Sequence, residues 1–225
     1  MRPYCLFVLL GIFSSCVSSA LVSNGYKPNE QPAMVFTPPL GQIGLIEKGN
    51  SGSYDPTLSA KSTAAMRQIL LQYKRELRLS GELSVPDPRT QQRLTRETYR
   101  AINAVERQQR VGRPYELVVL DSLLDAQGQR YALLSAARGF TRVEGNYSNQ
   151  VAKSVGVGLL TLGMYVPVPI KATSSVFFLI YDRQDHAILY YNHAAPLEAE
   201  PLDPAVLDKQ MRKMLAKDFH FPPKS

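Results

Sequence analysis

Cysteine is nearly absent from this 225-residue chain: the sequence has two, Cys5 and Cys16, both close to the N-terminus. Because no cysteine follows residue 16, a folded domain made by the rest of the chain has no intramolecular disulfide and no thiol nucleophile. Its stability must therefore come from a hydrophobic core. Roughly 205 residues follow the N-terminal segment, which is enough for one domain with a sizeable core.

Histidines and catalytic motifs are also scarce. The three histidines are His186, His193 and His220, and the chain has no G-x-S-x-G, H-E-x-x-H, S-x-x-K or P-loop motif. A Ser-His-Asp triad is assembled by folding, so a hydrolase with His186 or His193 as general base remains an alternative. Asp182, Asp185 and His186 could bind a metal weakly, but a zinc site needs three or four ligands in fixed geometry. We expect a polar turn there, with no metal and no cofactor.

Long hydrophobic runs are missing as well, since no 18 uncharged apolar residues follow one another. The most apolar segment is Val151–Ile170, with about 15 uninterrupted residues. As a helix these would extend about 22 Å, which is short of the roughly 30 Å hydrocarbon core of a bilayer. Its glycines do not fit the dinucleotide-binding pattern G-x-G-x-x-G, because the third comes two places late. These glycines are Gly156, Gly158 and Gly163.

We expect Val151–Ile170 to be a buried helix that begins after Gly145-Asn146. Glycine has no Cβ, so the glycines of this segment would let a neighbouring backbone approach closely. Two alternatives stay open, because an apolar segment could also insert into a membrane or bind a partner protein.

The N-terminus carries the pattern of a secretion signal: Arg2, an apolar run over Tyr4–Phe13, and small residues before Cys16. Phe13-Ser14-Ser15-Cys16 resembles the lipobox of bacterial lipoproteins, in which a small residue precedes a cysteine that is acylated. Cleavage by an ordinary signal peptidase after Ala20 is the competing interpretation. We therefore assign residues 1–20 to the signal region, with Cys16 as the candidate lipidation site.

The lipobox resemblance implies a location and no activity. A lipid on Cys16 would anchor the protein to a membrane of the cell envelope. By the sorting pattern of such lipoproteins, Val17 in place of Asp favours the outer membrane, facing the periplasm. Export also makes nucleic acid a poor candidate partner.

Residues 21–54 are rich in Gly, Pro, Ser and Asn, which is the composition of a tether or irregular segment. Ala33–Phe36 and Ile43–Ile46 are candidate strands at a sheet edge. Asp55-Pro56 then predicts the start of a helix that ends at Gly81. The apolar stripe of this helix is Met66, Ile69, Leu70, Tyr73 and Leu77.

Two further helices are predicted after Asp87-Pro88 and Asp203-Pro204, and Gly112-Arg113-Pro114 ends the first of them. Each has apolar residues at helical spacing. They are Leu94, Thr98, Ala101, Ile102 and Val105 in the first, and Leu207, Met211, Met214 and Leu215 in the second.

Two hairpins are predicted, one from Leu117–Leu124 with Tyr131–Ala137 and one from Val176–Tyr181 with Ala187–Tyr191. Residues 176–180 have no polar face, so that strand is expected to be covered on both sides. Neighbouring residues of a strand point to opposite faces, so at most one of Tyr190 and its neighbour Tyr191 is expected in the core.

This order of elements predicts an α+β fold with one domain over residues 55–218. We expect an antiparallel sheet of two hairpins packed against three to four helices, and a frayed tail over residues 219–225.

The second predicted helix has five arginines on one side, within a sector roughly 60° wide, opposite its apolar stripe. They are Arg89, Arg93, Arg96, Arg100 and Arg107. The two predicted helices together, from Lys61 to Arg113, carry essentially all of the net charge of +7. The arginines could bind lipid head groups, phosphates, acidic cell-wall polymers or an acidic partner protein. The plainer interpretation is a solvated helix face, softened by Glu97 and Glu106.

The favoured hypothesis is thus a lipid-anchored, non-enzymatic envelope protein that binds an anionic envelope component or a protein partner. One alternative is an envelope hydrolase with a histidine general base. Another is a subunit of a membrane-inserting assembly, in which Val151–Ile170 enters the membrane.

Overall fold

A computed structural model describes residues 20–161 and 168–221, so the signal region, Cys16 and Gly163 lie outside the described residues. The strands are β1 (Leu21–Val22), β2 (Met34–Phe36), β3 (Leu40–Lys48), β4 (Ser51–Tyr54), β5 (Leu79–Glu82), β6 (Tyr131–Arg142), β7 (Thr173–Asp182) and β8 (Ala187–His193). The helices are α1 (Pro56–Gln72), α2 (Pro88–Gln108), α3 (Val118–Ala126), α4 (Asn146–Leu160) and α5 (Pro204–Leu215). The α+β fold class is therefore confirmed.

The strands form one mixed sheet of eight, with β6 at its centre. On one side β6 pairs with β7 in antiparallel fashion, and β7 continues through β8 to β1. On its other side β6 pairs in parallel, first with β2 at Ala132–Leu133 and then with β3 at residues 136–142. Pro38 and Pro39 separate β2 from β3, and proline has no amide hydrogen to continue a ladder. Of the two predicted hairpins, the one formed by β7 and β8 is correct.

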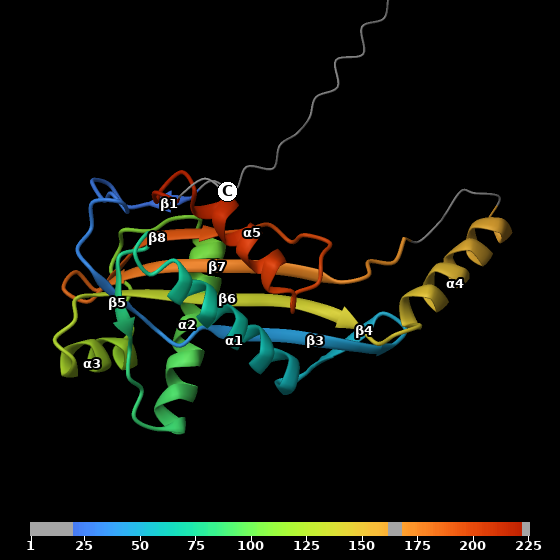
Figure 1. Ribbon diagram of the computed structural model, residues 1–225, viewed down its shortest axis with the longest axis horizontal. Coiled ribbons are helices and arrows are strands. Elements are labelled where there is room, and N and C mark those ends of the chain that lie inside the picture. Colours follow the sequence, from blue (N-terminus) through green and yellow to red (C-terminus); the bar gives the residue numbers. More distant parts are fainter. Residues whose placement is uncertain (1–19, 162–167, 222–225) are drawn as a thin grey trace, which may run out of the picture.

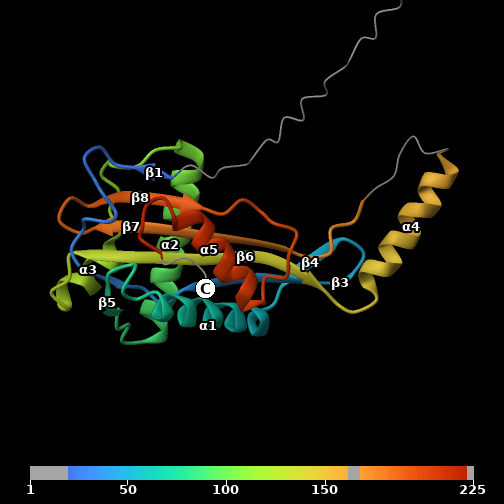
Figure 2. The ribbon, with the colours of Figure 1, turned by 45° about the horizontal axis from the view of Figure 1, so that its top comes forward.

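Helices cover both faces of this sheet, as Figures 1 and 2 show: α1 and α5 lie on one face, α2 and α3 on the other. The first layer packs Met66 of α1 and Met211 of α5 on Phe178 of β7. The second layer packs Ile102 of α2 and Leu120 of α3 on strand residues of the opposite face. The continuously apolar strand β7 is therefore covered on both sides, as predicted.

Burial on both faces corrects the expectation for the two neighbouring tyrosines. Tyr190 and Tyr191 do point to opposite faces, but both are buried, each in its own core layer. Neighbouring residues of a strand are divided between core and solvent only when one face of the sheet is solvated. Here helices cover both faces of the sheet, so both residues are buried.

Aspartate followed by proline starts three of the helices, as the sequence predicts. Asp55 accepts a hydrogen bond from the Leu58 amide at the start of α1, and Asp87 and Asp203 cap α2 and α5 in the same way. These side chains satisfy amides of the first turn that have no partner within the helix. The predicted end of α1 was wrong, because Gly81 belongs to β5 and the helix ends at Gln72.

The predicted strand Leu117–Leu124 is instead helix α3. The N-cap, Leu117, supplies no side-chain acceptor. Glu97 of α2 takes that role, since its carboxylate accepts hydrogen bonds from the amides of Val119 and Leu120 at 2.9–3.2 Å. A cap supplied from about twenty residues away cannot be seen in the local sequence.

The predicted tether over residues 21–54 and the frayed tail also need correction. Residues 21–54 contribute strands β1 to β4 to the sheet, and the strands β2 and β3 both lie along β6. Phe219 is buried in the first core layer, and Phe221 packs partly against it. The tail beyond Phe221 lies outside the described residues.

Close packing of α1 on β3 makes one glycine necessary. A Cβ on Gly41 would collide with the backbone carbonyl of Ser59 in α1. The side-chain hydroxyl of Ser59 accepts a hydrogen bond from the amide of Ile43 in β3, which holds the two elements close together. Gly41→Ala should lower the free energy of unfolding by about 1–3 kcal/mol, because backbone atoms must move apart. Gly44→Ala in the same strand is the control, since its nearest neighbour would be at an ordinary 3.5 Å. Denaturant unfolding measures both, and equal stabilities would contradict the packing described.

Candidate binding surfaces

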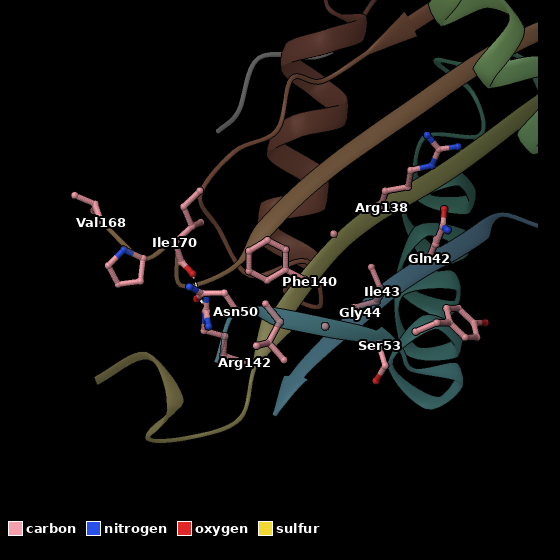
Figure 3. A pocket seen from close by; sticks show the side chains of 15 residues that line it. Gln42, Ile43, Gly44, Asn50, Ser53, Arg138, Phe140, Arg142, Val168 and Ile170 are labelled. Carbon is pink, nitrogen blue, oxygen red and sulfur yellow. Dashed lines mark hydrogen bonds between the residues drawn. The ribbon is translucent and has the colours of Figure 1, made fainter. Parts of the chain in front are cut away.

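Arg142, the last residue of β6, fastens α4 to the sheet. Its guanidinium donates hydrogen bonds to the carbonyls of Ile170 (2.8 Å) and Gly49 (2.7 Å). It also donates to the side-chain oxygens of Asn146 (2.7 Å) and Asn50 (2.9 Å). Figure 3 shows Arg142, Asn50 and Ile170 close together at one end of the view. One planar fork of donors thus joins the β3–β4 turn, the start of α4 and the chain that returns to β7.

The start of α4 is fixed by two neighbouring residues. Gly145 has the left-handed φ of 78°, which favours glycine. Asn146 is buried and donates its amide to the carbonyl of Glu47 at 3.2 Å. The predicted helix start after Gly145-Asn146 is therefore confirmed. The sequence carries no signal for the role of Arg142, because its acceptors come from three separate segments.

Beyond this root, α4 leaves the body of the protein. Figures 1 and 2 both show it projecting from the end of the sheet, clear of the other helices. We call α4 and the described residues 168–170 the arm. Within it Val155 is 55% exposed, Leu159 74%, Leu160 87% and Val168 81%. Among the described residues, no helix is long and apolar enough to cross a membrane.

The expectation that Val151–Ile170 forms a buried element is therefore wrong. A Cβ on Gly156 would meet no atom within 4 Å, so this glycine does not serve a close backbone approach. Apolar composition indicates burial only if another element covers the segment, and among the described residues the arm is largely uncovered.

An open hollow of about 690 Å³ lies at the root of the arm, between the β3–β4 hairpin, the end of β6 and residues 168–170. Figure 3 shows Phe140 and Ile43 along it, with Arg138 at one end. Arg138 lies 3.6 Å from the carboxylate of Glu106 and stacks at 4.8 Å over the ring of Phe177. Its charge is thus partly matched inside the protein, and the described lining includes no carboxylate.

The five arginines of the predicted stripe all lie on α2 and are exposed. Arg107 donates to the carbonyl of Asn103 in its own helix. Within the described part of the chain, no hydrogen bond or ion pair joins the guanidinium groups of the other four to any residue. These four are Arg89, Arg93, Arg96 and Arg100.

The acids expected to soften this stripe are turned to other contacts. Glu97 caps α3, and Glu106 lies beside Arg138 of β6. Both carboxylates therefore serve the packing of α2 on its neighbours rather than its arginines. The exposed face of α2 carries more uncompensated positive charge than the sequence alone indicates.

The candidate histidines are not brought together. His186 is the last residue of the β7–β8 turn, and its Nδ1 lies 3.0 Å from the carboxylate of Asp121. Ser122 lines a second hollow together with His186 and Asp121, but its hydroxyl donates to the carbonyl of Val118. His193 instead stacks on the ring of Phe177. The described residues place no hydroxyl in hydrogen-bond contact with either imidazole.

The two carboxylates of the β7–β8 turn that could help to bind a metal, those of Asp182 and Asp185, both lie near Arg130. Asp182 is buried and accepts two-pronged hydrogen bonds from Arg130 at 2.6–3.1 Å. Asp185 lies 3.7 Å from the same guanidinium. Within residues 20–161 and 168–221, no three potential ligands gather in a geometry that could hold a metal ion.

Comparison with known proteins gives only distant likenesses. No family model matches the chain, and no curated protein is similar to it in sequence. A variant PelC dodecamer from Paraburkholderia phytofirmans is 9% identical with a TM-score of 0.35. A DUF4136 family protein from Bacteroides thetaiotaomicron is 5% identical with a TM-score of 0.32. Each alignment covers 89% of this chain and 94% of the other, and neither likeness is close enough to bear on function.

Replacing Arg142 should loosen the arm while leaving the sheet intact. We expect Arg142→Gln to lower the free energy of local opening at the root of α4 by about 1–3 kcal/mol, because hydrogen bonds from a charged donor are lost. Hydrogen exchange of the amides in residues 143–150 should accelerate accordingly. Arg107→Gln is the matched control, since that arginine bonds only within its own helix. Unchanged exchange in the Arg142 variant would show that the arm is held by other contacts.

Proposed function

We propose that this protein is an exported envelope protein, anchored by a lipid on Cys16, that binds an anionic component through the arginine face of α2 and catalyses no reaction. The observation that carries the binding role is the exposed row of arginines whose neighbouring acids, Glu97 and Glu106, are turned to internal contacts. Positive charge without an internal partner is available to an external one.

The geometry of the row favours an extended anionic ligand. Arg89 and Arg107 are 18 residues apart on one helix, which corresponds to about 27 Å. A guanidinium binds phosphate or carboxylate through two parallel hydrogen bonds, and it keeps its charge at any physiological pH. A row of such groups suits an array of phosphates or carboxylates, such as a lipid surface, a lipopolysaccharide core or an acidic polymer, better than one small molecule.

The anchoring role is supported by the chain length between lipid and domain. Cys16 lies four residues before Ala20, the first described residue, so the acylated cysteine could lie at most about 14 Å from it. The domain would thus be held close to the membrane, which we place at the periplasmic side of the outer membrane. The pairing of β1 with β8 fixes the direction from which the anchor leaves the fold.

The hydrolase alternative receives less support. The contact between His186 and Asp121 resembles the base and orienting carboxylate of a triad, but Ser122, the serine that lines the same hollow, donates its hydroxyl within its own helix. A hydrolase would need this hydroxyl to turn towards the imidazole.

Neutralising the centre of the row should weaken binding with little effect on folding. Replacing Arg93, Arg96 and Arg100 together with Gln should reduce affinity for anionic vesicles by roughly tenfold to a hundredfold, at about 1 kcal/mol or less per charge. The remaining binding should depend less on salt, because exposed charges are screened. Vesicle sedimentation at several salt concentrations measures both effects.

The matched control removes three lysines from α5 and the turn after it, Lys209, Lys213 and Lys217, which are also exposed. Equal losses in both triple variants would mean that only net charge matters, and the specific role of α2 would be wrong. A third variant with Lys at 93, 96 and 100 separates charge from fork geometry, because lysine cannot bind a phosphate through two parallel hydrogen bonds. Thermal unfolding should show that all three variants fold.

The lipid anchor has its own test. Cys16→Ser should abolish metabolic labelling with palmitate and release the protein from membranes, because the sulfur of Cys16 is the proposed attachment point of the lipid. The control is Cys5→Ser, which removes the other cysteine and should leave labelling unchanged. N-terminal sequencing of mature protein that begins at Leu21 would contradict lipidation at Cys16.

A further inference from the structure

The arm collects an unusual share of the exposed apolar side chains. Five of the eleven large hydrophobic residues that are exposed in the described structure lie on it. They are Val155, Leu159, Leu160, Val168 and Ile170. Scattered exposed apolar residues are normal on a soluble protein, but a concentrated group marks a surface that contacts something else.

Charge is missing from the same part of the chain. Between Lys153 and Lys171 the sequence has no Asp, Glu, Lys or Arg, so the two lysines flank an uncharged stretch. Long lysine side chains can lay their methylenes on an apolar surface while the ammonium group stays in water. An uncharged apolar end flanked by lysines matches the chemistry of a bilayer interface, where the acyl chains begin below the head groups.

The dimensions of the arm fit contact rather than crossing. Helix α4 has 15 residues and is about 22 Å long, which is short of the hydrocarbon thickness. Arg142 fixes its root to the sheet, so only the far part can enter another phase. A depth of roughly 5–10 Å is typical of apolar groups held at the interface, and it would bury Leu159 and Leu160.

The placement of the arm favours a bilayer over another occupant. In Figures 1 and 2 the far end of α4 and the strand β1, which follows the anchor segment, lie at opposite ends of the long axis of the molecule, both towards the upper edge of each view. One flat surface along that edge could meet both points. This orientation rests on the proposed lipid at Cys16, whereas the affinity of the arm for lipid does not.

We propose that the arm is a lipid-contacting element, which inserts Val155, Leu159 and Leu160 into the interface of the membrane that carries the anchor. The lipid on Cys16 and the arm would then hold the domain at two separate points. Two contacts on one rigid body restrict its rotation, so the arm would set how the domain is oriented on the membrane. A single acyl anchor cannot do this.

The absence of tryptophan allows a direct test. The mature chain with Cys16→Ser removes the lipid, and Leu159→Trp then places a single tryptophan on the arm. With zwitterionic phosphatidylcholine vesicles, which offer no net charge to α2, its fluorescence should shift to shorter wavelength and be quenched by lipids brominated on their acyl chains. Val118→Trp is the matched control, because Val118 is 53% exposed on α3, away from the arm. It should show neither effect.

A second experiment measures how strongly the protein partitions into neutral vesicles. Leu159→Ser with Leu160→Ser should lower partitioning into the same neutral vesicles at least about tenfold, since two large apolar side chains no longer leave water. Replacing Arg93, Arg96 and Arg100 with Gln should leave this partitioning unchanged. The two sets of variants therefore separate failure of the arm from failure of the arginine face.

Three results would overturn the lipid assignment. The first is an unshifted and unquenched Leu159→Trp at all lipid concentrations. The second is a shift that grows with protein concentration without lipid, which would assign the arm to a second copy of this chain. The third is unchanged partitioning of the double serine variant.

Discussion

The ladder of backbone hydrogen bonds along β6 is the interaction on which the rest of the structure depends. This strand pairs with β7 on one side and with β2 and β3 on the other, so it joins the N-terminal and C-terminal halves of the chain. Residues 132–137 of β6 are all small or aliphatic and are buried on both faces, which lets a layer of helices approach from either side. A Cβ on Gly139 would collide with the carbonyl of Thr173 in β7, so the pairing also depends on a glycine. Without this ladder neither helix layer would have a surface to cover.

Sequence reasoning succeeded where the determinants are local. The aspartate-proline starts of α1, α2 and α5 and the β7–β8 hairpin depend on neighbouring residues, and all four were predicted. It failed where the determinant is distant. Ala33–Phe36 was predicted as a strand, but at the edge of the sheet, whereas β2 pairs in parallel with both β5 and β6. Helix α3 was missed because it is capped by Glu97 of another helix. Composition alone made residues 21–54 look like a tether, although β3 is nine residues long and lies on the central strand.

The same distinction applies to the candidate binding surfaces. Helical phase is a local property, so the exposure of the arginine row on α2 could be predicted from spacing. The direction in which Glu97 and Glu106 point could not, because α3 and Arg138 attract them from elsewhere in the fold. Hydrophobicity likewise identified Val151–Ile170 as unusual but could not say whether a neighbour covers it. In the structure Val155, Leu159 and Leu160 of α4 are exposed, and Arg142 holds the start of this helix to the end of the sheet.

The contrasting roles of the arginines explain why the two surfaces can act independently. Arg142 has four acceptors within reach at the end of β6, and its charge is used to fix the arm. Arg93, Arg96 and Arg100, although chemically identical, make no hydrogen bond or ion pair with the described residues, and only Arg93 lies close enough to a carboxylate, that of Asp87, to interact with it electrostatically. Acceptors, rather than residue type, therefore decide which arginines stabilise the fold and which remain available. The four acceptors that fix the arm are two backbone carbonyls and two asparagine side chains, so these hydrogen bonds involve no carboxylate. The electrostatic attraction proposed for α2 and the apolar contact proposed for α4 are consequently separable by substitution and by salt.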